Sequence, residues 1–202
     1  MSHSTASELT PEERLLLNSL LDSHSPVDDE EALHLRNIQA FVGRHGDPFA
    51  REVLEGHLTG SAFVLDPAGR VLLTHHKKLG IWVQLGGHSD GEREAPAVAM
   101  REAVEESGLE DLVFHPALVV GSSPRLLDVD VHTIPGNPST PEHEHLDLRF
   151  LITTSQPEKI VRDHAESNAL EWLDMEAARA RSDPGMHRAL SRIEVLLSAA
   201  EK

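Results

Sequence analysis

The segment that decides the fold of this chain begins with Gly86-Gly87-His88-Ser89-Asp90-Gly91-Glu92 and continues, from residue 101, as Arg101-Glu102-Ala103-Val104-Glu105-Glu106-Ser107-Gly108-Leu109. Residues 95–107 are predicted to form a helix, which the following glycine ends. Residues three and four apart lie side by side on a helix, so Glu102, Glu105 and Glu106 project from one face. The segment therefore presents three carboxylates to one side.

Three carboxylates so close together repel one another, and no lysine stands at the neighbouring helix positions to relieve the repulsion. Oxygen ligands that converge from a single turn suit Mg²⁺ or Mn²⁺, which accept substrate phosphates as further ligands. The pair Gly86-Gly87 lets the backbone pass close to whatever the carboxylates hold. Spacing alone leaves a charged surface helix as the alternative interpretation.

The composition of the 202-residue chain restricts its function further. A net charge of −16 argues against general binding to nucleic acid backbones, which would be repelled. The absence of cysteine excludes a disulfide framework, a thiolate nucleophile and a cysteine-rich zinc site. The sequence contains neither a long apolar run nor a secretory signal pattern, so we expect a cytoplasmic protein that does not insert into membranes.

Residues 1–56 are predicted to form an N-terminal helical extension. Thr10-Pro11-Glu12-Glu13 combines a capping threonine, a proline in the first turn and a capping-box glutamate, so a helix begins there. A second helix is expected over 28–42, closed by Gly43, and a third, short helix over 47–56.

From residue 57 the pattern changes to strands. Residues 62–65 and 71–73 are predicted to form a hairpin around the turn Asp66-Pro67-Ala68-Gly69. Further strands are expected in the ranges 81–85, 112–121, 126–134, 145–154 and 169–173, and a final helix follows Asp183-Pro184. This order predicts an α+β fold, an α/β/α sandwich around a mixed β-sheet, with residues 57–202 as the main domain.

Two of the predicted strands alternate polar and apolar residues. The polar positions are Asp128, Asp130 and His132 in the first strand and His143, His145, Asp147 and Arg149 in the second. If the strands pair, these faces merge and could form a pocket wall or an accessory metal site, although the solvent-exposed side of a sheet is the favoured interpretation. Arg149 is a candidate for binding a substrate phosphate, because its planar fork matches phosphate oxygens.

Gly87 and the run from Arg101 to Leu109 together resemble the Nudix box. Its pattern is a glycine, five residues, a glutamate, seven residues, then Arg-Glu-aliphatic-x-Glu-Glu-x-Gly-aliphatic. One position departs from it: Arg93, between two glutamates, stands where the first box glutamate belongs. Further stretches resemble an uncharacterised bacterial branch of the Nudix hydrolase family, namely residues 57–62, 82–88 and 142–150.

The resemblance implies roles for individual residues. Glu105 and Glu106 would coordinate Mg²⁺ or Mn²⁺ together with the carbonyl oxygen of Gly86. Glu102 would be a further ligand or the base that activates water, and Arg101 would orient a neighbouring carboxylate in the catalytic group.

Members of the family often recruit another carboxylate from a loop beyond the box. Glu166 is the first candidate for this catalytic role and Glu171 the second, with solvated loop glutamates as the alternative interpretation. Trp82 could stack on a base of the substrate, with a place in the core as its alternative, and His88 is a further substrate-binding candidate beside the glycines.

A member of this family would hydrolyse the diphosphate linkage of a nucleoside diphosphate derivative, so its partner would be a small-molecule nucleotide. ADP-ribose or a sugar nucleotide is preferred, because the chain has no tyrosine, which dinucleoside-polyphosphate members place after the box. Pro124, fifteen residues beyond Leu109, has a spacing similar to that of ADP-ribose-cleaving members. Arg93 leaves open a catalytically impaired nucleotide-binding or regulatory module, and homodimer formation is also left open.

Overall fold

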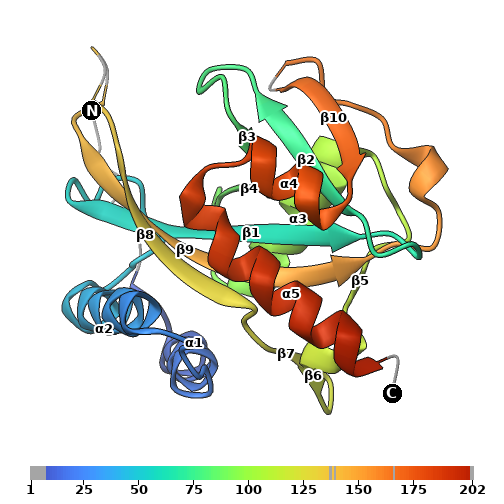
Figure 1. Cartoon of the computed structure of the whole chain (residues 1–202). Coiled ribbons are helices and arrows are strands. Elements are labelled where there is room, and N and C mark those ends of the chain that lie inside the picture. Colours follow the sequence, from blue (N-terminus) through green and yellow to red (C-terminus); the bar gives the residue numbers. More distant parts are fainter. Residues whose placement is uncertain (1–7, 137, 139, 166, 201–202) are drawn as a thin grey trace.

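The structure is a computed structural model that describes residues 8–136, 138, 140–165 and 167–200. Figure 1 shows a mixed β-sheet with α3 on one face and α4 and α5 on the other, so the predicted α+β sandwich is confirmed. The α-helices are α1 (Pro11–Asp22), α2 (Asp29–Arg44), α3 (Ala95–Ser107), α4 (Met175–Arg181) and α5 (His187–Ala200). Short 3₁₀ helices are η1 (Pro116–Leu118), η2 (Pro157–Lys159) and η3 (Pro184–Met186).

The main sheet has eight strands, with the central order β10-β2-β1-β9-β5. Strands β3, β4 and β8 pair with β2, β1 and β9, respectively, and a separate two-stranded sheet joins β6 to β7. Only β1 and β9 are parallel to each other among the paired strands of the described residues. The strands are β1 (Gly56–Leu65), β2 (Val71–His76), β3 (Trp82–Val83), β4 (Leu85–His88), β5 (Val113–Phe114), β6 (Val119–Val120), β7 (Ser123–Pro124), β8 (Asp128–Ile134), β9 (His143–Thr153) and β10 (Ser167–Leu173).

The alternation of side chains along β1 divides the core into two layers. Leu58, Ala62 and Val64 pack with α3 and the N-terminal helices, whereas Phe63 and Leu65 pack with α4 and α5. All five side chains are at most 1 % exposed. The central strand is therefore covered on both faces.

Gly60 of β1 allows α3 to approach the sheet closely. A Cβ atom at this position would lie 2.9 Å from the carbonyl oxygen of Ala95 and 2.9 Å from Cβ of Val98. Both distances are shorter than ordinary carbon contacts, so a larger residue would push the helix away from β1. Because α3 carries the three glutamates, this contact fixes their height above the sheet.

The N-terminal helices share the core of the sheet. The predicted capping box is present, because the N–H of Glu13 donates to Thr10 Oγ1 at 3.2 Å and the N–H of Thr10 donates to the Glu13 carboxylate at 2.7 Å. Leu21 and Ile38 of α1 and α2 belong to the same buried cluster as Leu146 of β9. The division of the chain at residue 56 stays a prediction.

The short helix predicted over 47–56 is wrong. Asp47 Oδ1 accepts the N–H of Phe49 at 3.1 Å, and successive turns follow from Asp47 to Ala50 and from Ala50 to Val53. These i to i+3 contacts and the local side-chain bond to the backbone replace helical hydrogen bonds. The segment then joins the sheet, since the N–H of Leu58 donates to the carbonyl oxygen of Pro48 at 2.8 Å.

Other predicted elements differ in their limits. The strand predicted over 112–121 is interrupted by η1, where proline fixes the backbone in a turn, so only β5 and β6 remain. The run 81–85 is divided between β3 and β4.

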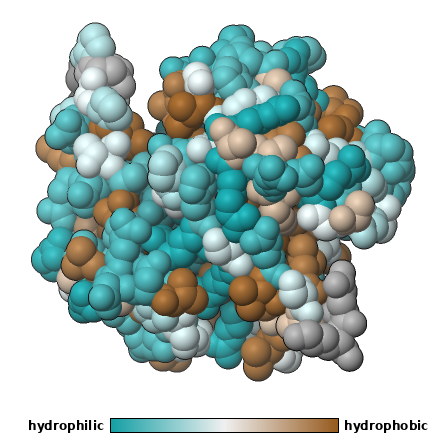
Figure 2. All heavy atoms as spheres, viewed as in Figure 1, coloured by the Kyte–Doolittle hydropathy of each residue, from teal (hydrophilic) through white to brown (hydrophobic). Residues whose placement is uncertain are grey.

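No helix of the described part of the chain is long and apolar enough to cross a membrane. Figure 2 shows a mostly hydrophilic face with small, separated apolar groups.

Candidate active site

The helix that carries the glutamates forms where the sequence predicted it. Helix α3 spans Ala95–Ser107 and ends at Gly108, which adopts the left-handed conformation with φ 67° and ψ 7°. Its N–H donates to the carbonyl oxygen of Val104 at 2.8 Å, which closes the last turn. A Cβ atom on Gly108 would also lie 2.9 Å from Cβ of Val161, so only glycine fits here without strain.

Two of the three glutamates are buried against the glycine pair. Glu102 and Glu106 are 8 % and 7 % exposed, whereas the side chain of Glu105 is 58 % exposed. Glu106 Oε2 accepts the N–H of Gly86 at 3.0 Å. A Cβ atom on Gly87 would lie 2.7 Å from the carboxylate of Glu102, so this glycine leaves the room that the carboxylate fills. The backbone of β4 and the carboxylates of α3 therefore form one acidic group.

Arg101 holds this acidic group in place. Its Nη1 donates to Glu102 Oε1 at 2.9 Å and to Glu105 Oε2 at 2.8 Å. Its Nε donates to Glu92 Oε2 at 2.9 Å, and its Nη2 donates to the carbonyl oxygen of His88 at 2.7 Å. One guanidinium thus fixes two glutamates of the helix relative to the loop before it, and a catalytic role for Arg101 stays a prediction.

Burial changes the protonation of Glu102. Desolvation raises the pKa of its carboxyl group above the ordinary value, although the positive charge and hydrogen bond of Arg101 act in the opposite direction. Buried carboxylates with raised proton affinity need a compensating positive charge to remain ionised. Their oxygen atoms suit Mg²⁺ and Mn²⁺, hard cations that prefer carboxylate and carbonyl ligands. The donor set of Glu102, Glu105 and Glu106 therefore fits such an ion.

Arg93, which replaces the first glutamate of the box pattern, contacts the N-terminal part of the chain. Its Nη2 donates to Asp47 Oδ2 at 2.9 Å, and its Nη1 lies 3.8 Å from Glu13 Oε2 of α1. Nη1 also donates to the carbonyl oxygen of Glu8 at 3.2 Å. The substitution thus joins the loop before α3 to the helical extension, and Glu92 next to it contacts Arg101 instead.

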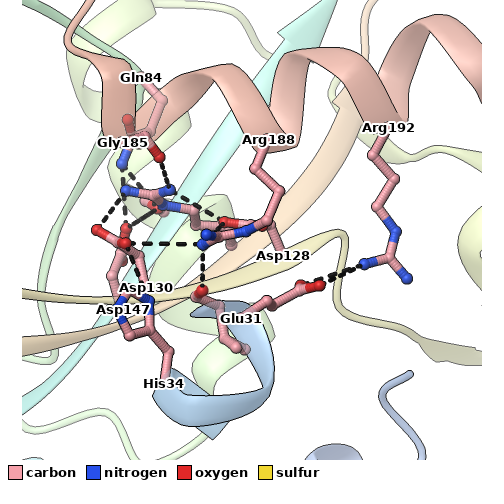
Figure 3. A network of polar contacts seen from close by, with 12 residues as sticks. Glu31, His34, Gln84, Asp128, Asp130, Asp147, Gly185, Arg188 and Arg192 are labelled. Atoms are coloured by element: carbon pink, nitrogen blue, oxygen red, sulfur yellow. Dashed lines mark hydrogen bonds and ion pairs between the residues drawn. The ribbon is translucent and has the colours of Figure 1, made fainter. Parts of the chain in front are cut away.

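The two alternating strands pair as the sequence indicated, but the part of their merged polar face that carries the aspartates and Arg149 is buried. Strand β8 runs antiparallel to β9, with Asp128 opposite Arg149 and Asp130 opposite Asp147. These four residues are between 0 % and 7 % exposed. Over these four residues the favoured interpretation, the solvent-exposed side of a sheet, is wrong, because helix α5 and the turn before it cover them (Figure 3). Further along the same face His132 is exposed, and His143 and His145 are half-buried.

Arg149 lies in the middle of this network. Its side chain is 4 % exposed and donates to Asp147 at 3.0 Å, to Asp128 at 3.0 Å and to Asp130 at 2.9 Å. Nη1 also donates to the carbonyl oxygen of Gly185 at 2.9 Å. All three nitrogen atoms are thus engaged inside the protein, an arrangement that favours a structural role. Substrate binding by Arg149 stays a prediction.

The remaining candidates lie at other places in the fold. Trp82 is half-buried, with its ring 5.4 Å from that of His75 and the guanidinium of Arg181 5.4 Å above it. Glu171 forms an ion pair with Arg181 at 2.7 Å. Glu166 lies outside the described residues. In the described part of the chain, the ring contacts of Trp82 and the ion pair of Glu171 are therefore made to residues outside the acidic group.

His88 has neighbours that the sequence interpretation did not assign to a site. Its ring lies 5.0 Å from that of His57 and 4.9 Å from that of His145. His57 begins a polar alternation with Thr59 and Ser61 that runs along β1. That alternation is the signal that could have identified His57, although three strands have to be placed in order before the histidines meet.

The comparison with known proteins assigns the family. The NUDIX domain model matches residues 57–193. A binary complex of the C. elegans Ap4A hydrolase is 17 % identical, with a TM-score of 0.55, and the match covers 70 % of this chain and 98 % of that one. A NUDIX family hydrolase from Clostridium perfringens is 27 % identical, with a TM-score of 0.51, and the match covers 69 % and 97 %. No functionally curated protein matches the chain.

The E. coli dihydroneopterin triphosphate pyrophosphohydrolase also has a similar fold, with 19 % identity, a TM-score of 0.50 and coverage of 70 % of this chain and 95 % of that one. The family model covers more than half of the chain. The chain therefore belongs to the NUDIX family. It is a Nudix-type hydrolase, of the class that cleaves pyrophosphate linkages in nucleotide derivatives.

Proposed function

We propose that this enzyme uses Mg²⁺ or Mn²⁺, held by Glu102, Glu105 and Glu106, to hydrolyse the diphosphate linkage of a nucleoside diphosphate derivative. The observation that carries the proposal is the burial of two of these carboxylates against Gly86 and Gly87. Buried carboxylates that cluster on one helix turn are costly unless a cation balances them. An enzyme of this acidity also needs a cation to meet a negatively charged substrate.

The residues of the chain divide the chemical work between them. Glu102, whose pKa burial raises above the ordinary value, acts either as a ligand of the ion or as the base that accepts a proton from the attacking water. Arg101 keeps this carboxylate and that of Glu105 in a fixed geometry. A bound divalent ion supplies charge neutralisation for the phosphate oxygens and makes water a better nucleophile. The water oxygen forms a bond to phosphorus, the bridging P–O bond breaks, and the departing phosphate oxygen keeps the electron pair.

Within the class, ADP-ribose or a similar sugar nucleotide is our preferred substrate. The preference rests on the absence of tyrosine from the sequence and on the position of Pro124, which lies in β7. Trp82 and His88 are the proposed contacts to the substrate, because both lie on the strands that lead to the acidic group. Trp82 is half-buried, so part of its ring is available for stacking on a base of the substrate.

A panel of nucleotide diphosphates tests this proposal. The full chain is incubated with ADP-ribose, sugar nucleotides, dinucleoside polyphosphates and nucleoside triphosphates, with Mg²⁺, with Mn²⁺ and with chelator. We expect release of a nucleoside monophosphate from the sugar nucleotides only when a divalent ion is present. Tight binding without turnover in every condition would instead support a nucleotide-binding or regulatory module that has lost catalysis.

A further inference from the structure

Five histidines gather on one face of the sheet, near the end where β1 and β9 begin and β4 finishes. They come from four adjacent strands: His57 from β1, His88 from β4, His132 from β8, and His143 and His145 from β9. In the register of the sheet His57 stands opposite His145, which in turn stands opposite His132. His88 stands opposite Thr59, two residues from His57 and therefore on the same face. The pairing of the strands thus builds the cluster.

Three of these side chains have the arrangement of a metal site. One ligand nitrogen from each of His57, His88 and His145 lies within 4.8 Å of the other two. The ring of His57 lies 5.0 Å from each of the other two rings, and these lie 4.9 Å apart and perpendicular to each other. Three nitrogen atoms on a tetrahedral zinc ion are about 3.3 Å apart at the usual bond length, so modest rotations of the side chains would complete the geometry.

The hydrogen bonding of the cluster also points to a ligand. His57 is 3 % exposed, and neither of its ring nitrogens has a hydrogen-bond partner among the described residues. The same holds for Nε2 of His145 within the described part of the chain. Leaving a buried polar atom unpaired is costly, so a fold rarely keeps three of them together without a use.

The protonation of the cluster suits a cation. Burial, followed by repulsion from neighbouring histidines and Arg51, lowers the pKa of His57 to about 4. Burial also lowers the pKa of His88 to about 4 and that of His145 to about 2. Burial therefore favours the neutral form of the three imidazoles, in which a ring nitrogen can donate its lone pair to a metal. Arg51 brings a positive charge to this region, but it forms an ion pair with Asp90 at 2.8 Å.

We propose that His57, His88 and His145 bind one transition-metal ion of the zinc type, at a site distinct from the glutamates of α3. Imidazole ligands favour Zn²⁺, Ni²⁺ or Cu²⁺, whereas carboxylates favour Mg²⁺ and Mn²⁺, so the two sites select different ions. Three protein ligands leave a fourth position of a tetrahedral ion for water or for an oxygen of a bound molecule. The proposal does not depend on the proposed hydrolysis.

The residues around the three ligands support the same site. Nδ1 of His143 bonds to the carbonyl oxygen of Pro141 at 2.9 Å and must donate to it, so its Nε2 carries the lone pair in the neutral ring. Its ring lies 5.1 Å from that of His57. His132 is fixed by Asp130 at 3.0 Å, with its ring 5.6 Å from that of His145. Pro141 and Asp130 thus hold two further imidazoles at the border of the site, beside the three proposed ligands.

His88 connects this histidine site with the acidic group on α3. The carbonyl oxygen of His88 accepts a hydrogen bond from Arg101 at 2.7 Å, and the same guanidinium binds Glu102 and Glu105. A metal ion on the ring of His88 would therefore fix the backbone that positions Arg101. The backbone of His88 thus connects the histidine site to the acidic group, although the two sites share no ligand.

Calorimetric titration of Zn²⁺ into the metal-free, full-length chain tests the proposal, using protein without a histidine tag and with excess Mg²⁺ to occupy the glutamates. We expect one Zn²⁺ per chain and an affinity at least about tenfold weaker in His57→Ala and His145→Ala. Two matched controls are His164→Ala, an exposed histidine outside the cluster, and Glu106→Gln in the acidic group. Both controls should bind Zn²⁺ as the wild type does.

The absorption of Co²⁺ provides a second measurement that does not rely on the most buried residues. Co²⁺ bound by three imidazoles in a four-coordinate site gives strong visible bands, which His88→Ala should lose while keeping the circular dichroism of the fold. His88 is only half-buried, so its truncation is the mildest test of folding. Absence of stoichiometric Zn²⁺ binding, equal weakening in His164→Ala, or loss only in Glu106→Gln would each overturn the proposal.

Discussion

Glu31 of α2 and Arg192 of α5 form an ion pair of 3.1 Å across 161 positions of the sequence (Figure 3). The side chain of Glu31 is fully buried, and its carboxylate also contacts His24 Nε2 at 2.7 Å and accepts the N–H of Val27 at 2.6 Å. This pair attaches the N-terminal helices to the last helix of the sandwich. The helical extension is therefore held to the rest of the fold by charge as well as by the shared core.

Replacing Glu31 by alanine should lower the free energy of unfolding by about 3 kcal/mol, because the change leaves Arg192 without its buried partner. The neighbouring Glu30 provides a matched control. Its side chain is 72 % exposed and pairs with Arg188 at 3.0 Å, so Glu30→Ala should cost less than about 1 kcal/mol. Urea unfolding of the two variants measures both values, and equal effects would show that the buried pair does not hold the helices.

The same carboxylate predicts a dependence of stability on pH. Burial alone would raise the pKa of Glu31, but hydrogen bonds from His24 and Val27 and the charge of Arg192 hold it below the ordinary value of 4.5. The unfolded chain then takes up the proton more readily, so the stabilisation is complete above about pH 4.5 and is lost as the pH falls through the lower, folded pKa. The difference in unfolding free energy between wild type and Glu31→Gln should shrink between pH 6 and pH 3. A constant difference over this range would contradict the assignment.

Glu106→Gln should reduce kcat of the proposed hydrolysis at least about a hundredfold while leaving the fold intact, because it removes a charged ligand but keeps the shape of the side chain. Circular dichroism verifies the fold, and nucleotide release measures kcat. Glu110→Gln, an exposed glutamate just beyond Gly108, is the control that should retain full activity. Near-normal turnover by Glu106→Gln would contradict the assignment of the Mg²⁺ or Mn²⁺ site to the glutamates of α3.

The sequence predicted the elements whose signals are local. Helix α3 spans the predicted range 95–107 and ends at the glycine that indicated its end, since caps and breakers act over one or two turns. The third helix, predicted over 47–56, is replaced by turns, and the cause is again local: the side chain of Asp47 accepts a hydrogen bond from the N–H of Phe49 and starts a turn. The glycine pair also lies against the carboxylates as expected, because the box pattern places both within one strand-to-helix unit.

The features that the sequence left open depend on contacts between distant parts of the chain. Alternation in β8 and β9 identified the polar face, but not that α5 would cover it through Arg188, which lies 60 positions from Asp128. The histidine cluster likewise needs the strand order β4-β1-β9, which no single stretch of sequence contains. The alternation along a strand predicts which face of the sheet a residue occupies, whereas the topology of the sheet decides which residues it contacts.

Replacing Arg149 by methionine should destabilise the protein by about 3–5 kcal/mol, since three buried aspartates would lose their common cation. Arg36→Met, on the exposed side of α2, is the control and should change stability by less than about 0.5 kcal/mol. Arg149→Lys separates the two interpretations of this residue. A folded Arg149→Lys protein with an unchanged melting temperature and a raised KM would support the substrate contact instead of the structural role.

Restoring the first glutamate of the box pattern with Arg93→Glu should cost about 2 kcal/mol of stability without increasing activity. The new carboxylate would face Asp47 and Glu13, which Arg93 now contacts at 2.9 and 3.8 Å. Arg93→Gln removes the positive charge without adding repulsion, so it should be destabilised by a smaller amount. Thermal unfolding compares the two variants, and kcat/KM of the folded proteins should stay within about threefold of the wild type. A tenfold gain in Arg93→Glu would instead mean that Arg93 impairs catalysis, as expected of a regulatory module derived from an enzyme.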